Sequence, residues 1–197
     1  MKINHLRHPV LAIALLSVLF FSCSKSKDSA SQSGTYYFKA NIGGKSYNVS
    51  ATSNGTIEAG SGVDGTDDVA IFGTIDNNTD GSEFSITKGL MHSFTTASQT
   101  DMKNFFKAGT YNYSAGAQNG IDISWYDANG KSWSTSSGSA DQTGSNFKIV
   151  SVMDDPDAAG RYYVKVQSSF NCILYDGTGN SMLLTGGQMV GAFGPLN

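Results

Sequence analysis

The segment with the most recognisable chemical spacing covers residues 76–81, Asp-Asn-Asn-Thr-Asp-Gly. Oxygen-bearing side chains at alternate positions, Asp76, Asn78 and Asp80, followed by a glycine are how an EF-hand calcium loop begins. Such a loop ends with a bidentate glutamate at its twelfth position, which here is Thr87. The flanking residues also alternate as strands do. We therefore interpret the segment as a polar hairpin turn, with a weak calcium site at Asp76, Asn78 and Asp80 as the alternative.

Two other acidic loops, at 64–68 and 154–157, carry carboxylates that hard cations prefer. Aspartate is also frequent in turns, because its side chain bonds to the backbone two residues further on. We interpret both loops as turns. The alternative is that these loops bind a metal ion, each by itself or both together.

Three aromatic residues, Trp125, Tyr126 and Trp133, lie on either side of one expected turn. Flat aromatic faces offer apolar surface on which a sugar ring can stack. Trp125 alternates with Ile121 and Ile123, which favours a core position for Trp125. Tyr126 and Trp133 have fewer apolar residues at alternate positions beside them, which favours the core less. The group therefore predicts a carbohydrate-binding surface if its members are exposed together, and core packing if they are not.

The sequence offers little for catalysis. His92 is the only histidine outside the first 22 residues, so a three-histidine zinc site is excluded there and a Ser-His-Asp triad would have to use it. The nucleophile-elbow pattern Gly-x-Ser-x-Gly is absent from the sequence. Cys172 lies in an apolar strand pattern, which indicates a buried small hydrophobe rather than a nucleophile. No pair of carboxylates stands out for glycoside hydrolysis.

The elements that would position these residues are strands. From residue 35 onward, apolar side chains alternate with polar ones and turn residues interrupt them at short intervals, which is typical of a β-sandwich or barrel. We predict an all-β domain over 35–197: a single antiparallel β-sandwich or flattened barrel of about eleven strands. One short helical turn is expected near 100–107, capped by Thr100 and ended by Gly109. The expected strands cover 36–42, 47–51, 69–75, 83–90, 110–113, 121–125, 131–135, 147–152, 161–175, 181–185 and 188–193.

The N-terminal segment 1–22 has the order of a secretory signal. Lys2 and Arg7 precede an uncharged apolar run over 10–21, and polar residues begin after Cys23. The run is shorter than the roughly 20 residues that a membrane-spanning helix needs. Residues 24–34 carry almost no apolar side chains, so we expect 23–34 to be a flexible tether that begins at the cysteine.

Net charge argues against a nucleic-acid partner. The whole chain carries −3 at neutral pH, and loss of Lys2 and Arg7 with the signal makes it two units more negative. Arg161 is then the only arginine, and no basic stripe is present to displace counterions from phosphates.

Several segments resemble known lipoproteins. The sequence Leu-Phe-Phe-Ser-Cys at 19–23 resembles a lipobox, although Phe21 and Phe20 depart from the usual small residue and leucine. Behind it, segments 38–47 and 160–172 and the glycine-rich 186–193 resemble small Bacteroidetes-type lipoproteins of uncharacterised β-sandwich families. The resemblance implies cleavage before the cysteine, acyl chains on Cys23 and anchoring at the outer membrane of the cell envelope. It carries no known activity.

Together these features predict a lipid-anchored envelope lipoprotein whose domain is a non-enzymatic binding or structural module without a cofactor. Its partners would be the membrane, through the lipid, and a glycan or another envelope protein. The first alternative is a carbohydrate-binding module that uses Trp125, Tyr126 and Trp133, and the second is an envelope hydrolase.

Overall fold

A computed structural model describes residues 35–63, 68–114 and 120–196. The expected signal peptide over 1–22 and the lipidated tether over 23–34 lie outside these residues. Within them the chain forms eleven strands, one 3-10 turn η1 (Phe94–Thr96) and one helix α1 (Gln99–Phe105). The strands are β1 (Tyr37–Ile42), β2 (Lys45–Ser50), β3 (Gly55–Val63), β4 (Val69–Asn77), β5 (Glu83–Met91), β6 (Gly109–Tyr111), β7 (Ile121–Tyr126), β8 (Ser132–Ser134), β9 (Asn146–Asp154), β10 (Tyr162–Tyr175) and β11 (Ser181–Leu196).

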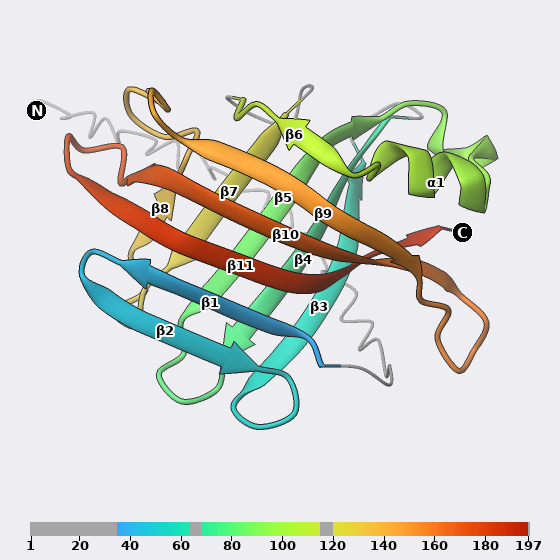
Figure 1. Ribbon diagram of the computed structural model, residues 1–197, viewed down its shortest axis with the longest axis horizontal. Coiled ribbons are helices and arrows are strands. Elements are labelled where there is room, and N and C mark those ends of the chain that lie inside the picture. Colours follow the sequence, from blue (N-terminus) through green and yellow to red (C-terminus); the bar gives the residue numbers. More distant parts are fainter. Residues whose placement is uncertain (1–34, 64–67, 115–119, 197) are drawn as a thin grey trace, which may run out of the picture.

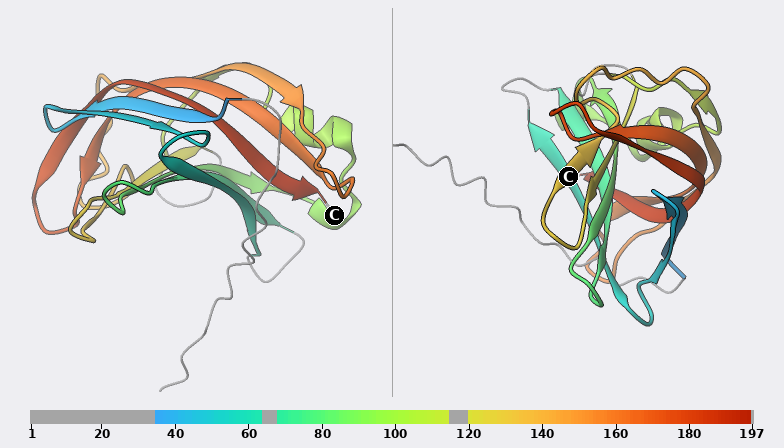
Figure 2. Two further views of the ribbon diagram at one scale, coloured as in Figure 1. Left: turned by 90° about the horizontal axis from the view of Figure 1, so that it is seen from below. Right: turned by 90° about the vertical axis from the view of Figure 1, so that its left-hand side faces the viewer.

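All named strands pair antiparallel in one sheet, in the order β2-β1-β11-β10-β8-β7-β5-β4-β3. Strand β9 pairs with β10 beside β8, and β6 pairs with β9. The sheet curls until β3 and β4 approach β11, which gives a flattened, nearly closed barrel (Figures 1 and 2). The all-β prediction is confirmed, and of its two forms the flattened barrel describes the fold.

The number of strands agrees with the prediction of about eleven, but the strands differ from the prediction in two places. Strand β3 was not predicted, because its sequence Gly-Thr-Ile-Glu-Ala-Gly-Ser-Gly-Val supplies few large apolar side chains for an alternation. The strands expected at 181–185 and 188–193 are one continuous strand, β11. Its pairing with β10 shifts register between Phe170 and Cys172, and Gly186, at φ 61°, provides the irregularity that looked like a turn.

Stacked phenyl rings fill the middle of the barrel. Phe38 stacks on Phe84 with 3.8 Å between ring centroids, and Phe84 stacks on Phe170 at 5.5 Å. Phe170 in turn stacks on Phe147 at 5.6 Å. These rings come from β1, β5, β10 and β9, so the column ties together strands that are distant in the sheet. Each buried ring contributes on the order of 2–3 kcal/mol to folding.

The barrel is flat because β4 and β11 approach closely across it. A Cβ atom added to Gly73 would lie 2.5 Å from the carbonyl oxygen of Ala192 and 3.0 Å from the ring of Phe193. Only glycine leaves room for this approach. The lumen is therefore narrow where the two strands face each other.

Helix α1 covers one end of the barrel (Figure 1). Its N-cap is Ser98 rather than the expected Thr100: the Ser98 hydroxyl accepts a hydrogen bond from the backbone of Asp101, whose carboxylate accepts one from the Ser98 backbone. This reciprocal capping box fixes the start of the helix two residues earlier than expected. Met102 and Phe106 point inward and are buried, with Phe106 at 4.8 Å from Phe193. No helix among the described residues has the length and apolarity to cross a bilayer.

Candidate functional site

The structure does not bring the three predicted aromatic residues together on the surface. Trp125 is 2 % exposed and meets the ring of Tyr47 edge-on at 4.7 Å, inside the barrel. Trp133 pairs with Trp125 across β7 and β8 and is 7 % exposed. Tyr126, on the opposite face of β7, is 45 % exposed. A sugar ring would therefore meet one of the three rings, not a platform.

Trp133 is covered by charged groups that hold its indole in place. Its Nε1 donates to Oδ2 of Asp127 at 3.3 Å, and Nζ of Lys131 lies 4.3 Å from its ring centroid. The Lys131 ammonium is fixed by Asp176, whose Oδ2 is 2.7 Å away. The lysine over the tryptophan is thus paired with an acid as well as with a ring.

The side chains of segment 76–81, for which a weak calcium site was the alternative interpretation, form hydrogen bonds within a hairpin turn. Oδ1 of Asp80 accepts hydrogen bonds from Nδ2 of Asn77 at 2.8 Å and from the Ser82 backbone at 3.1 Å. Asn78 turns away to Thr56, to which its Nδ2 donates at 3.1 Å. Within the described ranges, no group of three histidine, cysteine, aspartate or glutamate side chains is arranged to hold a metal ion. The arrangement is that of a polar turn.

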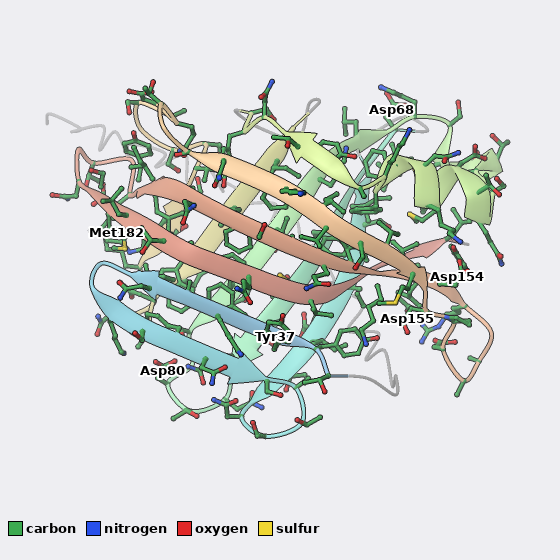
Figure 3. The ribbon with its side chains drawn as sticks, in the orientation of Figure 1. Tyr37, Asp68, Asp80, Asp154, Asp155 and Met182 are labelled. Carbon is green, nitrogen blue, oxygen red and sulfur yellow. The ribbon has the colours of Figure 1, made fainter. Side chains whose placement is uncertain are left out.

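The acidic loop at 154–157 is also built into the fold. Asp154 accepts from Tyr162 at 2.6 Å and pairs with Lys103 of α1 at 3.1 Å. Asp155 is buried and accepts a hydrogen bond from the hydroxyl of Tyr36. Asp80 lies far across the molecule from Asp154 and Asp155 (Figure 3). Of the loop at 64–68, residue 68 alone lies within the described part, where Asp68 pairs with His92; residues 64–67 lie outside it.

Cys172 is 2 % exposed, in agreement with the prediction of a buried small residue. Burial raises the pKa of its thiol to about 12. The thiolate that a nucleophilic cysteine requires is therefore strongly disfavoured at neutral pH.

The residue that stands out in the structure is Lys88, on the inward face of β5. Phe84 and Ile86 precede it on the same face, and all three are buried, with Lys88 at 8 % exposed. Its Nζ lies 4.2 Å from the ring centroid of Phe105 at the end of α1 and 4.6 Å from that of Tyr111 in β6. We call Lys88 and these two rings the Lys88 recess.

Within the described residues, the Lys88 ammonium has no carboxylate partner and no hydrogen-bond acceptor. Aromatic faces attract a cation, but each such contact contributes only about 0.5–2 kcal/mol. Burial lowers the pKa of Lys88 below its ordinary value, because the charged form has lost part of its water. A lysine side chain that is this deeply buried without an acid partner is rare in a folded domain and marks a candidate functional site.

A small apolar cavity adjoins Lys88 beneath α1. It has space for about one water molecule. Ser168 is the second polar residue of its wall, and its hydroxyl donates to the Met189 carbonyl at 3.4 Å. The cavity is lined by Ile86, Lys88, Phe106, Ile121, Phe147, Ile149, Val166, Ser168 and Phe193.

Comparison with known proteins gives no relative. The chain matches no family model, no curated protein and no solved structure. The Lys88 recess is consequently interpreted from its chemistry alone.

Sequence reasoning missed Lys88, although a signal was present. In the expected strand 83–90, Phe84, Ile86 and Lys88 share one parity, while Ser85 and Thr87 share the other. A lysine on the apolar parity of a strand either reaches past its neighbours to solvent or is buried for a reason. The sequence does not decide between these, because the covering rings come from distant segments.

The recess is suited to hold an anion. An ammonium supplies three hydrogen-bond donors and a compact charge, and low-polarity surroundings strengthen any ion pair formed there. Small-molecule sites commonly combine mostly apolar walls with one or a few polar or charged groups that fix the orientation of the ligand.

Proposed function

We propose that this protein is a lipid-anchored envelope lipoprotein whose barrel is a non-enzymatic binding module, with its ligand site at the Lys88 recess. The anchor part of the proposal rests on the signal-like segment and the lipobox that ends at Cys23. Acyl chains on Cys23 would hold the barrel at the outer membrane, with 24–34 as the tether.

The binding part rests on one observation: Lys88 is 8 % exposed and its ammonium has no acid partner among the described residues. Burying an unpaired charge costs stability. A methionine in its place would fill similar space without that cost. A residue that lowers stability is retained when function requires it.

The side chains that surround Lys88 favour binding over catalysis. Its neighbours are the rings of Phe105 and Tyr111 and apolar side chains, which neither accept nor donate protons readily at neutral pH. The acids Asp80, Asp154 and Asp176 are engaged in turns and ion pairs elsewhere in the barrel. A charge in an apolar wall attracts a ligand but offers no acid-base pair for a reaction.

The stability of Lys88→Met tests the binding part. We expect this variant to unfold at higher urea concentration than the wild type, with a gain of about 1–2 kcal/mol, because the buried charge is removed. The matched control is Lys131→Met, which we expect to lose stability because Lys131 is paired with Asp176 at 2.7 Å. Fluorescence of the buried Trp125 and Trp133 reports unfolding in both variants. A loss of stability in Lys88→Met as large as in Lys131→Met would show that the amine is structural and would remove the proposed site.

Labelling with a palmitate analogue in an envelope-bearing host tests the anchor. The wild-type chain is expected to acquire lipid and to appear in the membrane fraction, and Cys23→Ser is expected to acquire none. An unlabelled wild-type chain that retains residues 1–22 would contradict the anchor part and leave the binding part intact.

A further inference from the structure

We infer that the ligand of the Lys88 recess is an amphiphile with one carboxylate on an aliphatic chain. This inference rests on the proposed binding function and names the chemistry of its ligand. It combines the charge of Lys88, the apolarity of the adjoining wall and the position of the two rings that cover the ammonium.

The charge of the ligand follows from the cations at the recess. Among the described residues that line the cavity, Lys88 alone is positively charged. A single ammonium neutralises one negative charge, whereas a dianion such as a phosphate monoester would leave a second charge buried without a partner. Lysine also lacks the planar fork with which arginine holds phosphates in two-point contacts. One carboxylate is therefore the group that best complements this site.

The remainder of the ligand follows from the cavity wall. Seven of the nine lining residues are apolar, and the polar exceptions are Lys88 and Ser168. Ser168 already donates its hydroxyl proton to a backbone carbonyl. Each methylene group that leaves water for such a wall makes binding more favourable. A chain of hydroxyl groups, as in a sugar acid, would lose its hydrogen bonds in the same place.

Entry requires the covering rings to move. The cavity has space for about one water molecule, so an aliphatic chain needs Phe106, which lines the cavity, and the Phe105 ring packed on it to swing outward. Both are at the C-terminal end of α1, a helix of seven residues, and Phe105 is only half-buried. The Tyr111 hydroxyl donates to the carbonyl of Lys107, just beyond the helix. Displacing Phe105 exchanges a cation–π contact for an ion pair, which is the stronger interaction in apolar surroundings.

Protection of Lys88 from reductive methylation tests the inference at the site itself. The full chain in membranes is treated with formaldehyde and cyanoborohydride in the presence of octanoate, or of octan-1-ol as the uncharged probe of equal length. Peptide mass spectrometry gives the labelling of Lys88, with Lys165, which lies 4.3 Å over the ring of Tyr36, as the internal reference. We expect octanoate to protect Lys88 at concentrations about tenfold lower than octan-1-ol does, because only the carboxylate forms a charge-assisted hydrogen bond with the ammonium.

A second measurement is needed for Lys88→Met, because this variant has no amine at position 88 that can be labelled. Octanoate is expected to raise the unfolding temperature of the wild type and of Lys131→Met, and to lose this effect in Lys88→Met. Equal protection by octanoate and octan-1-ol, or no protection by either, overturns the carboxylate inference. Those outcomes leave the proposed binding function standing, because that function fails on a different result, a loss of stability in Lys88→Met.

Discussion

Two lysines lie over aromatic rings at opposite ends of β7, and their surroundings differ in one respect. Near its C-terminal end, Lys131 covers Trp133 at 4.3 Å and is paired with Asp176 at 2.7 Å. Near its N-terminal end, Lys88 pairs in register with Ile121 and faces Phe105 at 4.2 Å, without an acid among the described residues.

The comparison separates a structural lysine from a functional candidate. At the Lys131 end, the cation contacts both a ring and an acid, and the ion pair joins the turn between β7 and β8 to the turn between β10 and β11. At the Lys88 end, aromatic faces are the only groups among the described residues that stabilise the cation. They offset only part of the hydration free energy that it loses on burial. Proximity to an aromatic ring therefore does not mark a candidate site, whereas burial of the lysine without an acid partner does.

The largest expected effect comes from removing the ring at the Lys131 end. We expect Trp133→Ala to cost about 3–5 kcal/mol of folding free energy, because Trp133 is 7 % exposed and packs against the core. Urea unfolding measures the loss. A change below about 1 kcal/mol, within the range of surface substitutions, would mean that Trp133 is not part of the core and would revive the carbohydrate surface.

Asp176, the acid paired with Lys131, should make the stability of the fold depend on pH. Hydrogen bonds from Lys131 and Asn180 hold the pKa of the Asp176 carboxyl well below its usual range. Its contribution to stability is present above the unfolded-state pKa of about 3.9 and is lost as the pH falls further. Asp176→Asn is therefore expected to weaken the fold at pH 7 and to flatten the acid decline seen in the wild type. Parallel pH profiles for the two proteins would show that the pair contributes nothing.

A smaller change at the other end loosens the cover of Lys88. Ser98→Ala removes the side chain that caps α1 and is expected to cost about 1 kcal/mol. Because Phe105 ends this helix, Lys88 should become easier to methylate, while Lys165 should be unaffected. Unchanged labelling of Lys88 in a measurably destabilised protein would show that α1 does not control access to the recess.

The smallest effect is expected at Tyr126. Its ring is 45 % exposed on the outer face of β7, so Tyr126→Ala should alter stability by no more than about 0.5 kcal/mol. Binding to a glycan array should also stay at the wild-type level, since the neighbouring tryptophans are buried. A loss of glycan signal in this variant alone would contradict the core interpretation of the aromatic group.

Local patterns in the sequence predicted much of the barrel but not its site. The alternation in 161–175 and the Gly43-Gly44 turn gave β10 and the β1–β2 hairpin correctly. Strand β3 was not predicted, because its glycines interrupt the alternation of apolar and polar side chains. Its strand structure depends on pairing with β4. The Lys88 recess escaped for a related reason: α1 and β6 supply its rings, and no local pattern shows that they meet β5.

The most direct test of the central claim is the pH dependence of the stability difference between Lys88→Met and the wild type. Burial lowers the pKa of Lys88 below its ordinary value of 10.5, so the unfolded chain binds the proton more tightly than the folded chain does. The penalty in the wild type is thus complete below the lowered pKa and fades as the pH rises towards 10.5. Urea unfolding of both proteins between pH 7 and pH 10 should show the advantage of Lys88→Met shrinking. An advantage that grows with pH, or a variant that is less stable at pH 7, would contradict the account of Lys88 as a buried cation held for a ligand.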